Sequence, residues 1–358
     1  MANQTQIIGI QILRGIAALM VVFHHARSSV PDSANWFEFG ASGVDVFFVI
    51  SGFVMAHTAR SLDIETIGIR VRSAAHFIFK RILRVVPLYW LALIWTSRRE
   101  LSEGRFGTGL VKDFFFLPRL NPTYPDMLWP SVIQGWTLNY EMFFYVLFAV
   151  AMLAGRYRYW VLLGTLTSLV ILGVDSSLWD TLSFGATLPA ESRFYTNDIL
   201  LEFVYGVILQ RVFCACGYPR WPKWPFFLAM CSGFVLLAIG FDRPLRGVFV
   251  GLPALVIVWA AIPIFADMRL PKWQLLGDAS YAIYLFHWAS FGLAHPVAAK
   301  LTALTNQSLQ PFALTALLIS LYLSIAVISG IFIHLFLERP FSRHASNWLR
   351  MSPLGATR

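Results

Sequence analysis

The feature of this chain that most restricts its fold is a series of long apolar stretches along its 358 residues. The stretches run to about 17–25 residues, the length that an α-helix needs to cross the hydrocarbon layer of a bilayer. Hydrophobic residues make up 57% of the chain and charged residues 13%, so a soluble fold of this length could not bury its apolar surface. The sequence therefore predicts an all-α membrane protein.

The apolar stretches divide into about ten predicted spans, which would pack as a bundle of transmembrane helices. The spans are Ile7–Ala26, Gly43–Ala59, Phe77–Thr96, Val132–Leu153, Tyr159–Leu178, Ile199–Tyr218, Trp224–Phe241, Val248–Ala266, Leu275–Ala294 and Leu314–Phe336. Glu338-Arg339-Pro340 follows the last of them, and its proline predicts that the helix stops there.

An even number of spans places both termini on the same side of the membrane. Lys and Arg are more frequent in the loops on that side, so the positive-inside rule predicts that both termini are cytoplasmic. We expect a multi-pass protein of the bacterial inner (plasma) membrane, with a transmembrane domain over residues 1–345 and a short cytoplasmic tail over residues 346–358. The net charge of +9 does not indicate nucleic acid, because the basic residues lie between apolar stretches.

Arg14 and His25 are ionisable residues inside the first predicted span, where such residues are costly. They are eleven positions apart, and eleven steps return to within about 20° of the same helical face, displaced by about 16 Å. His24 points about 100° away, so geometry selects His25 as the partner of Arg14. The pair favours a functional site. The alternative is an interfacial histidine and a structural ion-pair partner.

Two acidic residues in later spans are predicted to lie near the depth of His25. Asp45 is at the start of the second span, and Glu141 is about one-third of the way down the fourth. A carboxylate at this depth can orient an imidazole and stabilise its protonated form, although a structural ion pair is the alternative. Ser51 precedes Gly52, and this small pair also permits simple close packing of helices.

Basic residues open the third span, and an aromatic–histidine pair lies in the ninth. Lys80 and Arg84 share a helical face with Arg81 between them, where they would grip the phosphates of a cofactor or anchor the helix at the cytoplasmic side. Tyr284 and His287 are three residues apart and therefore neighbours on one face.

Other catalytic motifs are missing from the sequence. It has no phosphate-binding Gly-Lys-Ser/Thr loop, no HExxH motif and no Gly-x-Ser-x-Gly elbow. Cys214 and Cys216 lack the companion ligands of a zinc site, so we predict no metal.

Taken in order, these residues resemble the acyltransferase-3 family of bacterial integral-membrane O-acyltransferases. The spacing of Arg14 and His25 matches the family hallmark. Later segments stand in family order over almost the whole chain: VDVFFVISGF, KRILRVVPLYW, WTLNYEMFFY, GDASYAIYLFHW and LERP. Tyr140 precedes a single Glu141 where the commoner family form has two adjacent Glu residues. That variant is similar to the exopolysaccharide branch, of the succinoglycan and xanthan type.

The resemblance implies acetyl transfer from acetyl-CoA to a sugar hydroxyl of an exopolysaccharide or its lipid-linked precursor. It implies His25 as the general base, with a transient acetyl-His25 as an alternative. Arg14 would position the donor or stabilise negative charge on the attacked thioester, and Asp45 or Glu141 would orient His25.

The expected binding residues follow from the same resemblance. The donor is expected at Lys80, Arg81, Arg84 and Tyr284, and the acceptor at Trp136, His287 and Ser51. Membrane lipid and polysaccharide assembly proteins are the other expected partners. Two other functions stay open: a transporter or flippase of a lipid-linked sugar, and an acyltransferase that acts on lipopolysaccharide or peptidoglycan.

Overall fold

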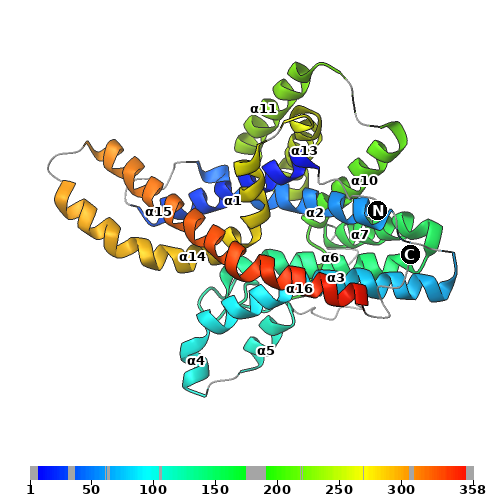
Figure 1. The fold of residues 1–358 in the computed structure, drawn as a ribbon, viewed down its shortest axis with the longest axis horizontal. Coiled ribbons are helices and arrows are strands. Elements are labelled where there is room, and N and C mark those ends of the chain that lie inside the picture. Colours follow the sequence, from blue (N-terminus) through cyan, green and yellow to red (C-terminus); the bar gives the residue numbers. More distant parts are fainter. Residues whose placement is uncertain are drawn as a thin grey trace. The chain divides into compact units, whose positions relative to one another are not determined.

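The computed structural model describes residues 7–30, 37–60, 62, 65–104, 107–174, 191–217, 219, 221–268, 270–305 and 310–351. These residues form helices and no strands (Figure 1). The longer helices are α1 (Ile8–Ser28), α2 (Gly43–Ala59), α3 (Ile67–Thr96), α6 (Trp136–Met152), α7 (Arg158–Val174), α10 (Leu200–Cys216), α11 (Lys223–Gly240), α13 (Gly251–Phe265), α14 (Pro271–Thr305) and α15 (Pro311–Ile333). Shorter helical segments include η1 (Glu38–Ser42), α4 (Arg98–Ser102), α5 (Thr108–Phe114), η2 (Ile133–Gly135), η3 (Gly155–Tyr157), α9 (Ser192–Tyr195), α12 (Arg246–Phe249), η4 (His334–Glu338) and α16 (Arg339–Met351).

The prediction of an all-α membrane protein is confirmed. Within the described residues, 6 helical stretches are long and apolar enough to cross a membrane: Ile8–Ser28, Glu38–Ala59, Ser192–Cys216, Lys223–Gly240, Arg246–Phe265 and Pro311–Leu349. Every predicted span overlaps one of the longer helices. The count of about ten spans and the cytoplasmic location of both termini remain predictions.

Two boundaries differ from the sequence prediction. The span predicted at Phe77–Thr96 is only the later part of α3, and the span predicted at Leu275–Ala294 is the middle of the 35-residue α14. Apolar length marks the lipid-facing part of a helix, whereas the helix itself continues wherever its backbone can hydrogen-bond.

The prediction that Glu338-Arg339-Pro340 ends the last helix is wrong. A π-helical turn, η4, follows α15, and α16 then continues to Met351. The wider turn just before Pro340 accommodates a residue that has no N–H to donate. Residues 346–351 of the predicted tail are therefore helical, and residues 352–358 lie outside the described residues.

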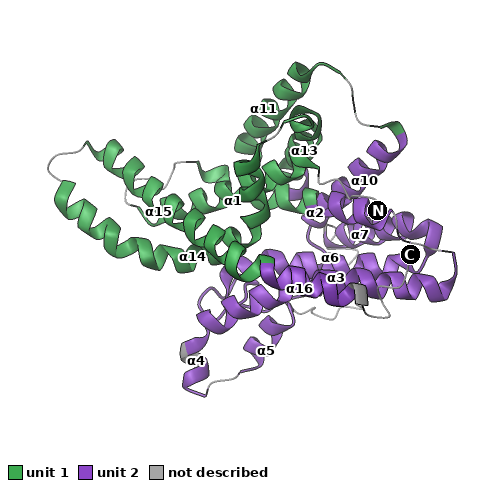
Figure 2. Cartoon of the chain, viewed as in Figure 1, with its two compact units in different colours: residues 1–50, 216–244, 249–339 green, residues 51–215, 245–248, 340–358 purple. Residues whose placement is uncertain are grey.

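The chain divides into two compact units (Figure 2). Unit 1 comprises residues 1–50, 216–244 and 249–339, and unit 2 comprises residues 51–215, 245–248 and 340–358. The boundary between Ile50 and Ser51 falls within α2, so this helix contributes residues to both units.

In unit 1, α1 packs closely along α14. A side chain at Gly277 of α14 would overlap the backbone carbonyl of Gln11 on α1, so glycine is required at this contact. Further along both helices, the ring of His25 lies beside that of His287, so α1 and α14 run parallel. Helix α15 also packs against α14, where the ring centroids of Phe291 and Tyr322 are 5.0 Å apart, and residues of α1, α14 and α15 share one hydrophobic core.

In unit 2, α2, α3 and α10 pack around α6. A Cβ at Gly52 would overlap the carbonyl of Phe203 on α10, which confirms that this position permits a close approach of two helices. Phe144 of α6 stacks on Phe203 with ring centroids 4.3 Å apart, and Phe148 stacks on Phe77 of α3 at 5.0 Å. Stacked aromatic rings therefore join α6 to α10 and to α3 in the core of this unit.

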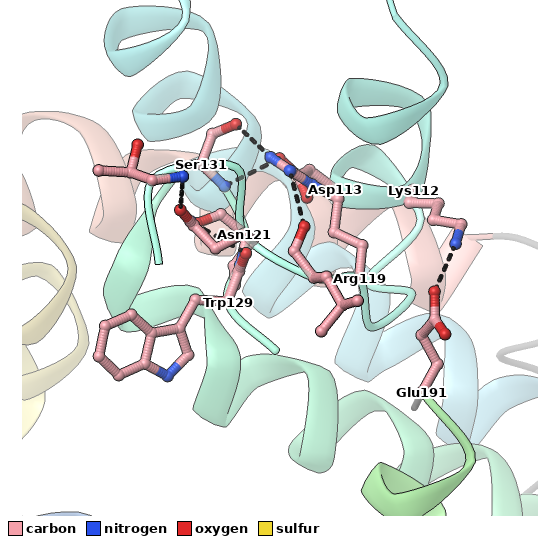
Figure 3. A network of polar contacts seen from close by, with 10 residues as sticks. Lys112, Asp113, Arg119, Asn121, Trp129, Ser131 and Glu191 are labelled. Atoms are coloured by element: carbon pink, nitrogen blue, oxygen red, sulfur yellow. Dashed lines mark hydrogen bonds and ion pairs between the residues drawn. The ribbon is translucent and has the colours of Figure 1, made fainter. Parts of the chain in front are cut away.

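The segment after α3 is held by a compact polar network in unit 2 (Figure 3). Asp113 is 0% exposed and is bound by Arg119, with Nε–Oδ1 at 2.7 Å and Nη2–Oδ2 at 2.9 Å. The Ser131 backbone N–H also donates to Asp113 Oδ2 at 2.9 Å, and Asn121 Oδ1 accepts from the backbone N–H groups of Thr123 and Tyr124. Hydrogen bonds and a buried ion pair therefore fix the conformation of this loop.

One ion pair joins this loop to the start of the next described segment. Lys112 Nζ lies 3.2 Å from Glu191 Oε1 (Figure 3). A hydrogen bond from its own backbone and one from Lys112 hold the pKa of the Glu191 carboxyl below its usual value.

Candidate active site

The predicted site residues fall into two groups, one in each unit. The unit 1 group contains Arg14, His25, Asp45, Tyr284 and His287, and the unit 2 group contains Ser51, Lys80, Arg81, Arg84, Trp136 and Glu141. Each group is built from helices that are far apart in the sequence.

His25 is held by its own helix in a defined orientation. Its Nδ1 lies 2.9 Å from the backbone carbonyl oxygen of Val21, one turn earlier in α1. A carbonyl oxygen can only accept, so Nδ1 must carry the hydrogen, and Nε2 of the neutral ring keeps its lone pair. His25 therefore presents a proton-accepting atom on the side away from α1.

His287 repeats this arrangement on α14. Its Nδ1 lies 2.6 Å from the carbonyl oxygen of Tyr284, so its Nε2 is again the acceptor. The ring centroids of His25 and His287 are 4.9 Å apart, and His287 is 0% exposed. The Trp288 ring lies against that of His25, with centroids 5.4 Å apart, and Trp288 is 41% exposed.

The neighbouring histidine of α1 has different partners. His24 Nδ1 lies 2.9 Å from the carbonyl oxygen of Glu38, and Arg27 Nη2 lies 3.4 Å from both His24 Nδ1 and Glu38 Oε1. His24 is thus tied to η1, whereas His25 contacts α14. This division follows the helical-face argument that separated the two residues.

Arg14 and Asp45 complete the unit 1 group. Arg14 lies on α1 with His25, at a half-buried position, as the spacing of the two residues predicts. Asp45 is 0% exposed in the first turn of α2, where a carboxylate is favoured by the helix dipole. The catalytic roles of both residues remain predictions.

In unit 2, Glu141 is brought together with Ser51. Glu141 Oε1 accepts hydrogen bonds from Ser51 Oγ at 3.2 Å and from the hydroxyl of Tyr145. Sequence reasoning missed Tyr145, although its position four residues after Glu141 on one helix was the available signal. This carboxylate therefore has donors from two helices, α2 and α6.

The basic residues of α3 are not equivalent to one another. Arg81 is 8% exposed, and its guanidinium carbon lies 5.6 Å from the Phe77 ring centroid and 5.9 Å from that of Tyr145. Its Nη2 donates to Thr58 Oγ1 at 3.4 Å. Lys80 is exposed and Arg84 is half-buried. Arg81 is therefore a caged cation, unlike an ordinary positive-inside anchor.

Trp136 and Tyr284 lie in aromatic surroundings. Trp136 begins α6 and packs edge-on against Tyr140 at 6.0 Å. Tyr284 lies 6.1 Å from the Phe47 ring and 6.2 Å from His287. The described part of the chain contains no group of three or more His, Cys, Asp or Glu residues that could hold a metal ion.

The two groups can perform different chemistry. The unit 1 group offers imidazole nitrogens that can accept a proton from a hydroxyl. The unit 2 group offers a caged guanidinium that can bind an anion, together with a carboxylate that already has its donors.

Comparisons with known proteins agree with the resemblance to membrane acyltransferases that the sequence motifs indicated. A family model described as an acyltransferase domain matches residues 7–343. The exopolysaccharide production protein ExoZ of Rhizobium meliloti is 31% identical, over 90% of this chain and 95% of its own length. A putative membrane-bound transacylase of Komagataeibacter xylinus, BcsY, is 24% identical over 79% of this chain and 72% of its own.

The name of a third relative includes an acceptor, peptidoglycan. The putative peptidoglycan O-acetyltransferase YrhL of Bacillus subtilis is 25% identical, over 81% of this chain and 49% of its own length. No solved structure matches the chain significantly. The match over residues 7–343 and the similarity to ExoZ show that the chain belongs to the acyltransferase family of multi-pass membrane O-acyltransferases.

Proposed function

We propose that this protein transfers an acetyl group from acetyl-CoA to a sugar hydroxyl of an exopolysaccharide or its lipid-linked precursor, in the bacterial inner membrane. One observation carries the proposal: the Val21 carbonyl fixes the tautomer of His25 so that Nε2 can accept a proton. Similarity to an exopolysaccharide production protein supports the acceptor class.

In this proposal His25 acts as the general base. Its Nε2 takes the hydroxyl proton while the hydroxyl oxygen attacks the thioester carbonyl, the bond to sulfur breaks, and the thiolate leaves. His25 then returns the proton to the thiolate, which departs as the free thiol of CoA. A half-buried imidazole suits this role because it can meet substrate and still be held by its helix.

Arg14 and Asp45 are assigned supporting roles. Arg14 lies about 16 Å along α1 from His25, so it is proposed to position the donor or to stabilise charge on it. Asp45 is proposed to stabilise the imidazolium that forms on His25. Glu141 remains a predicted catalytic carboxylate, and Tyr284 a predicted donor contact.

The donor's phosphates are assigned to the basic residues of α3. Arg81 is buried among aromatic rings, which strengthens its attraction for an anion. Lys80 and Arg84 flank it as further cations. Trp136 and Ser51 keep the acceptor-binding role predicted for them.

Transfer of radiolabelled acetyl groups tests the proposal directly. The purified protein is placed in lipid nanodiscs with labelled acetyl-CoA and with membranes of the exopolysaccharide-producing host as the source of acceptor. Label in the glycan fraction is the expected result. Absence of label from every glycan fraction would contradict the proposed reaction and favour the flippase alternative.

The similarity to YrhL favours one second candidate, acetylation of peptidoglycan. The same experiment separates the two, because peptidoglycan fragments and exopolysaccharide are isolated and counted separately. Label in muramic acid residues and none in exopolysaccharide would replace the proposed acceptor and keep the proposed reaction.

A further inference from the structure

One polar atom beside His25 has no role in the mechanism above. The Nε2 atom of His287 is buried and has no hydrogen-bond partner among the described residues. Its ring is 0% exposed, and Nδ1–H is committed to the Tyr284 carbonyl. Buried acceptors are rarely left without a donor, because the atom gives up water and gains nothing in return. His287 is therefore prepared for a group that donates a hydrogen bond.

The position of His287 limits where that group can be. Its ring centroid lies 4.9 Å from that of His25, so the two imidazoles are direct neighbours. Both rings are fixed from behind by backbone carbonyls, at 2.9 Å for His25 and 2.6 Å for His287. Neither ring can turn its Nε2 away without losing that bond.

His25 and His287 each offer an Nε2 acceptor, so the pair suits a ligand with two hydrogen-bond donors. We propose that His287 Nε2 accepts a hydrogen bond from a second hydroxyl of the sugar whose first hydroxyl gives its proton to His25. The inference rests on the proposed function and adds the substrate feature that it leaves open, a sugar with two free hydroxyls close together. A ligand with one hydroxyl would leave one of the two acceptors without a donor.

Trp288 is an exposed aromatic neighbour of both histidines. Trp288 contacts His25 at 5.4 Å and His287 at 6.1 Å and is 41% exposed, whereas His287 is closed off. In this proposal the second hydroxyl approaches Nε2 past the indole of Trp288. His287 then fixes which hydroxyl of the sugar meets His25, so it is a specificity-determining residue.

Three variants in a host strain that lacks the gene test this role. His287→Phe removes the acceptor and keeps a ring of similar size. His287→Gln restores an acceptor oxygen at a similar reach. His295→Phe is the matched control, because His295 is an exposed histidine on the same helix, with Nδ1 2.9 Å from the Phe291 carbonyl. The acetyl content of the exopolysaccharide and the acetylated position are read by two-dimensional NMR.

The wild-type protein is expected to restore acetyl at one hydroxyl, on a sugar that keeps a second free hydroxyl nearby. His287→Phe is expected to lower acetyl transfer on the order of tenfold, as for one lost hydrogen bond, and to spread the remainder over more than one position. His287→Gln is expected to recover part of the acetyl transfer and part of the preference for one position. His295→Phe is expected to change neither the amount of transfer nor the acetylated position.

Three results would overturn the inference. His287→Phe keeps the wild-type rate and position; or it loses transfer but keeps one acetylated position, which assigns His287 to proton transfer; or the wild-type product has no second free hydroxyl on the acetylated sugar. Failure of the proposed function looks different, because the wild-type gene itself would then restore no acetyl.

Discussion

The histidine pair of unit 1 and the Asp113 network of unit 2 are both fixed polar clusters, but only the network is complete. Asp113 receives donors from Arg119 and from the Ser131 backbone, and both of its oxygens are engaged. His287 Nε2 has no donor within the described residues. A buried network that is satisfied from within stabilises the fold, whereas a fixed acceptor without a donor can take its donor from a ligand, as we propose for His287.

The largest effect on acetyl transfer is expected from a substitution in the histidine pair of unit 1. His25→Ala should lower acetyl transfer by about 10²–10⁴-fold, the usual contribution of a general base, while the protein still inserts into the membrane. Labelled transfer per mole of membrane-inserted protein is the measurement. His24→Ala is the control and should be much milder, since His24 bonds to Glu38. An essential His24 with a dispensable His25 would reverse the assignment.

Asp113→Ala should break the complete network and affect folding rather than chemistry. It leaves Arg119, whose side chain is 12% exposed, without its carboxylate, and loss of one partner of a buried ion pair costs about 3–5 kcal/mol. Thermal unfolding of the detergent-solubilised protein measures the loss. Asp126→Ala, an exposed carboxylate in the same loop, should change the unfolding temperature little. Equal changes in unfolding temperature for the two variants would mean that the Asp113 network does not stabilise the fold.

Tyr145→Phe tests how much the hydrogen-bond donors of Glu141 stabilise the fold. This carboxylate has donors from two helices. Removal of the hydroxyl takes one donor from Glu141 Oε1, and a hydrogen bond to a charged group is worth about 1.5–3 kcal/mol. The free energy of unfolding should fall by this order. Ser51→Ala removes the donor at 3.2 Å and should have a smaller effect. If Ser51→Ala is the more damaging change, Ser51 has a role beyond packing.

The smallest effect is expected at Lys112 and Glu191. The pKa of Glu191 is lowered in the folded protein, so its contribution to stability is present above the unfolded pKa and is lost as the pH falls through the folded pKa. Lys112→Met should cost below about 1 kcal/mol, as surface ion pairs do. Unfolding temperatures measured over a pH series should converge in acid and at high salt. A gap that persists at acid pH would assign the effect to packing of Lys112.

Local pattern was sufficient for the helices and for pairs within one helix. Arg14 and His25 share α1, and Tyr284 is close enough to His287 for its carbonyl to fix the histidine ring. Helical periodicity determines such neighbours, and apolar length determines the spans. The same rules failed at Pro340, where a π-helical turn carries the helix past the proline.

Pairs between distant helices could not be read from the sequence. The contact of His25 with His287 depends on how α1 lies along α14, which Gly277 permits by letting the Gln11 backbone come close. The bond from Ser51 to Glu141 depends in the same way on how α2 lies beside α6. No local pattern contains the distance between two helices, so these contacts require the packed structure.

The length of α14, which carries His287, links the histidine pair to the thickness of the bilayer. Its 35 residues extend about 52 Å, well beyond a hydrocarbon layer of about 30 Å. The span predicted within it, Leu275–Ala294, would leave the rest of the helix outside the hydrocarbon layer, and the tilt of such a helix would depend on the thickness of the lipid around it. With this predicted span, variants of the two histidines should be compared in lipids of one fixed chain length, because a change in bilayer thickness would be expected to change the tilt of α14 in addition to any effect of the substitution.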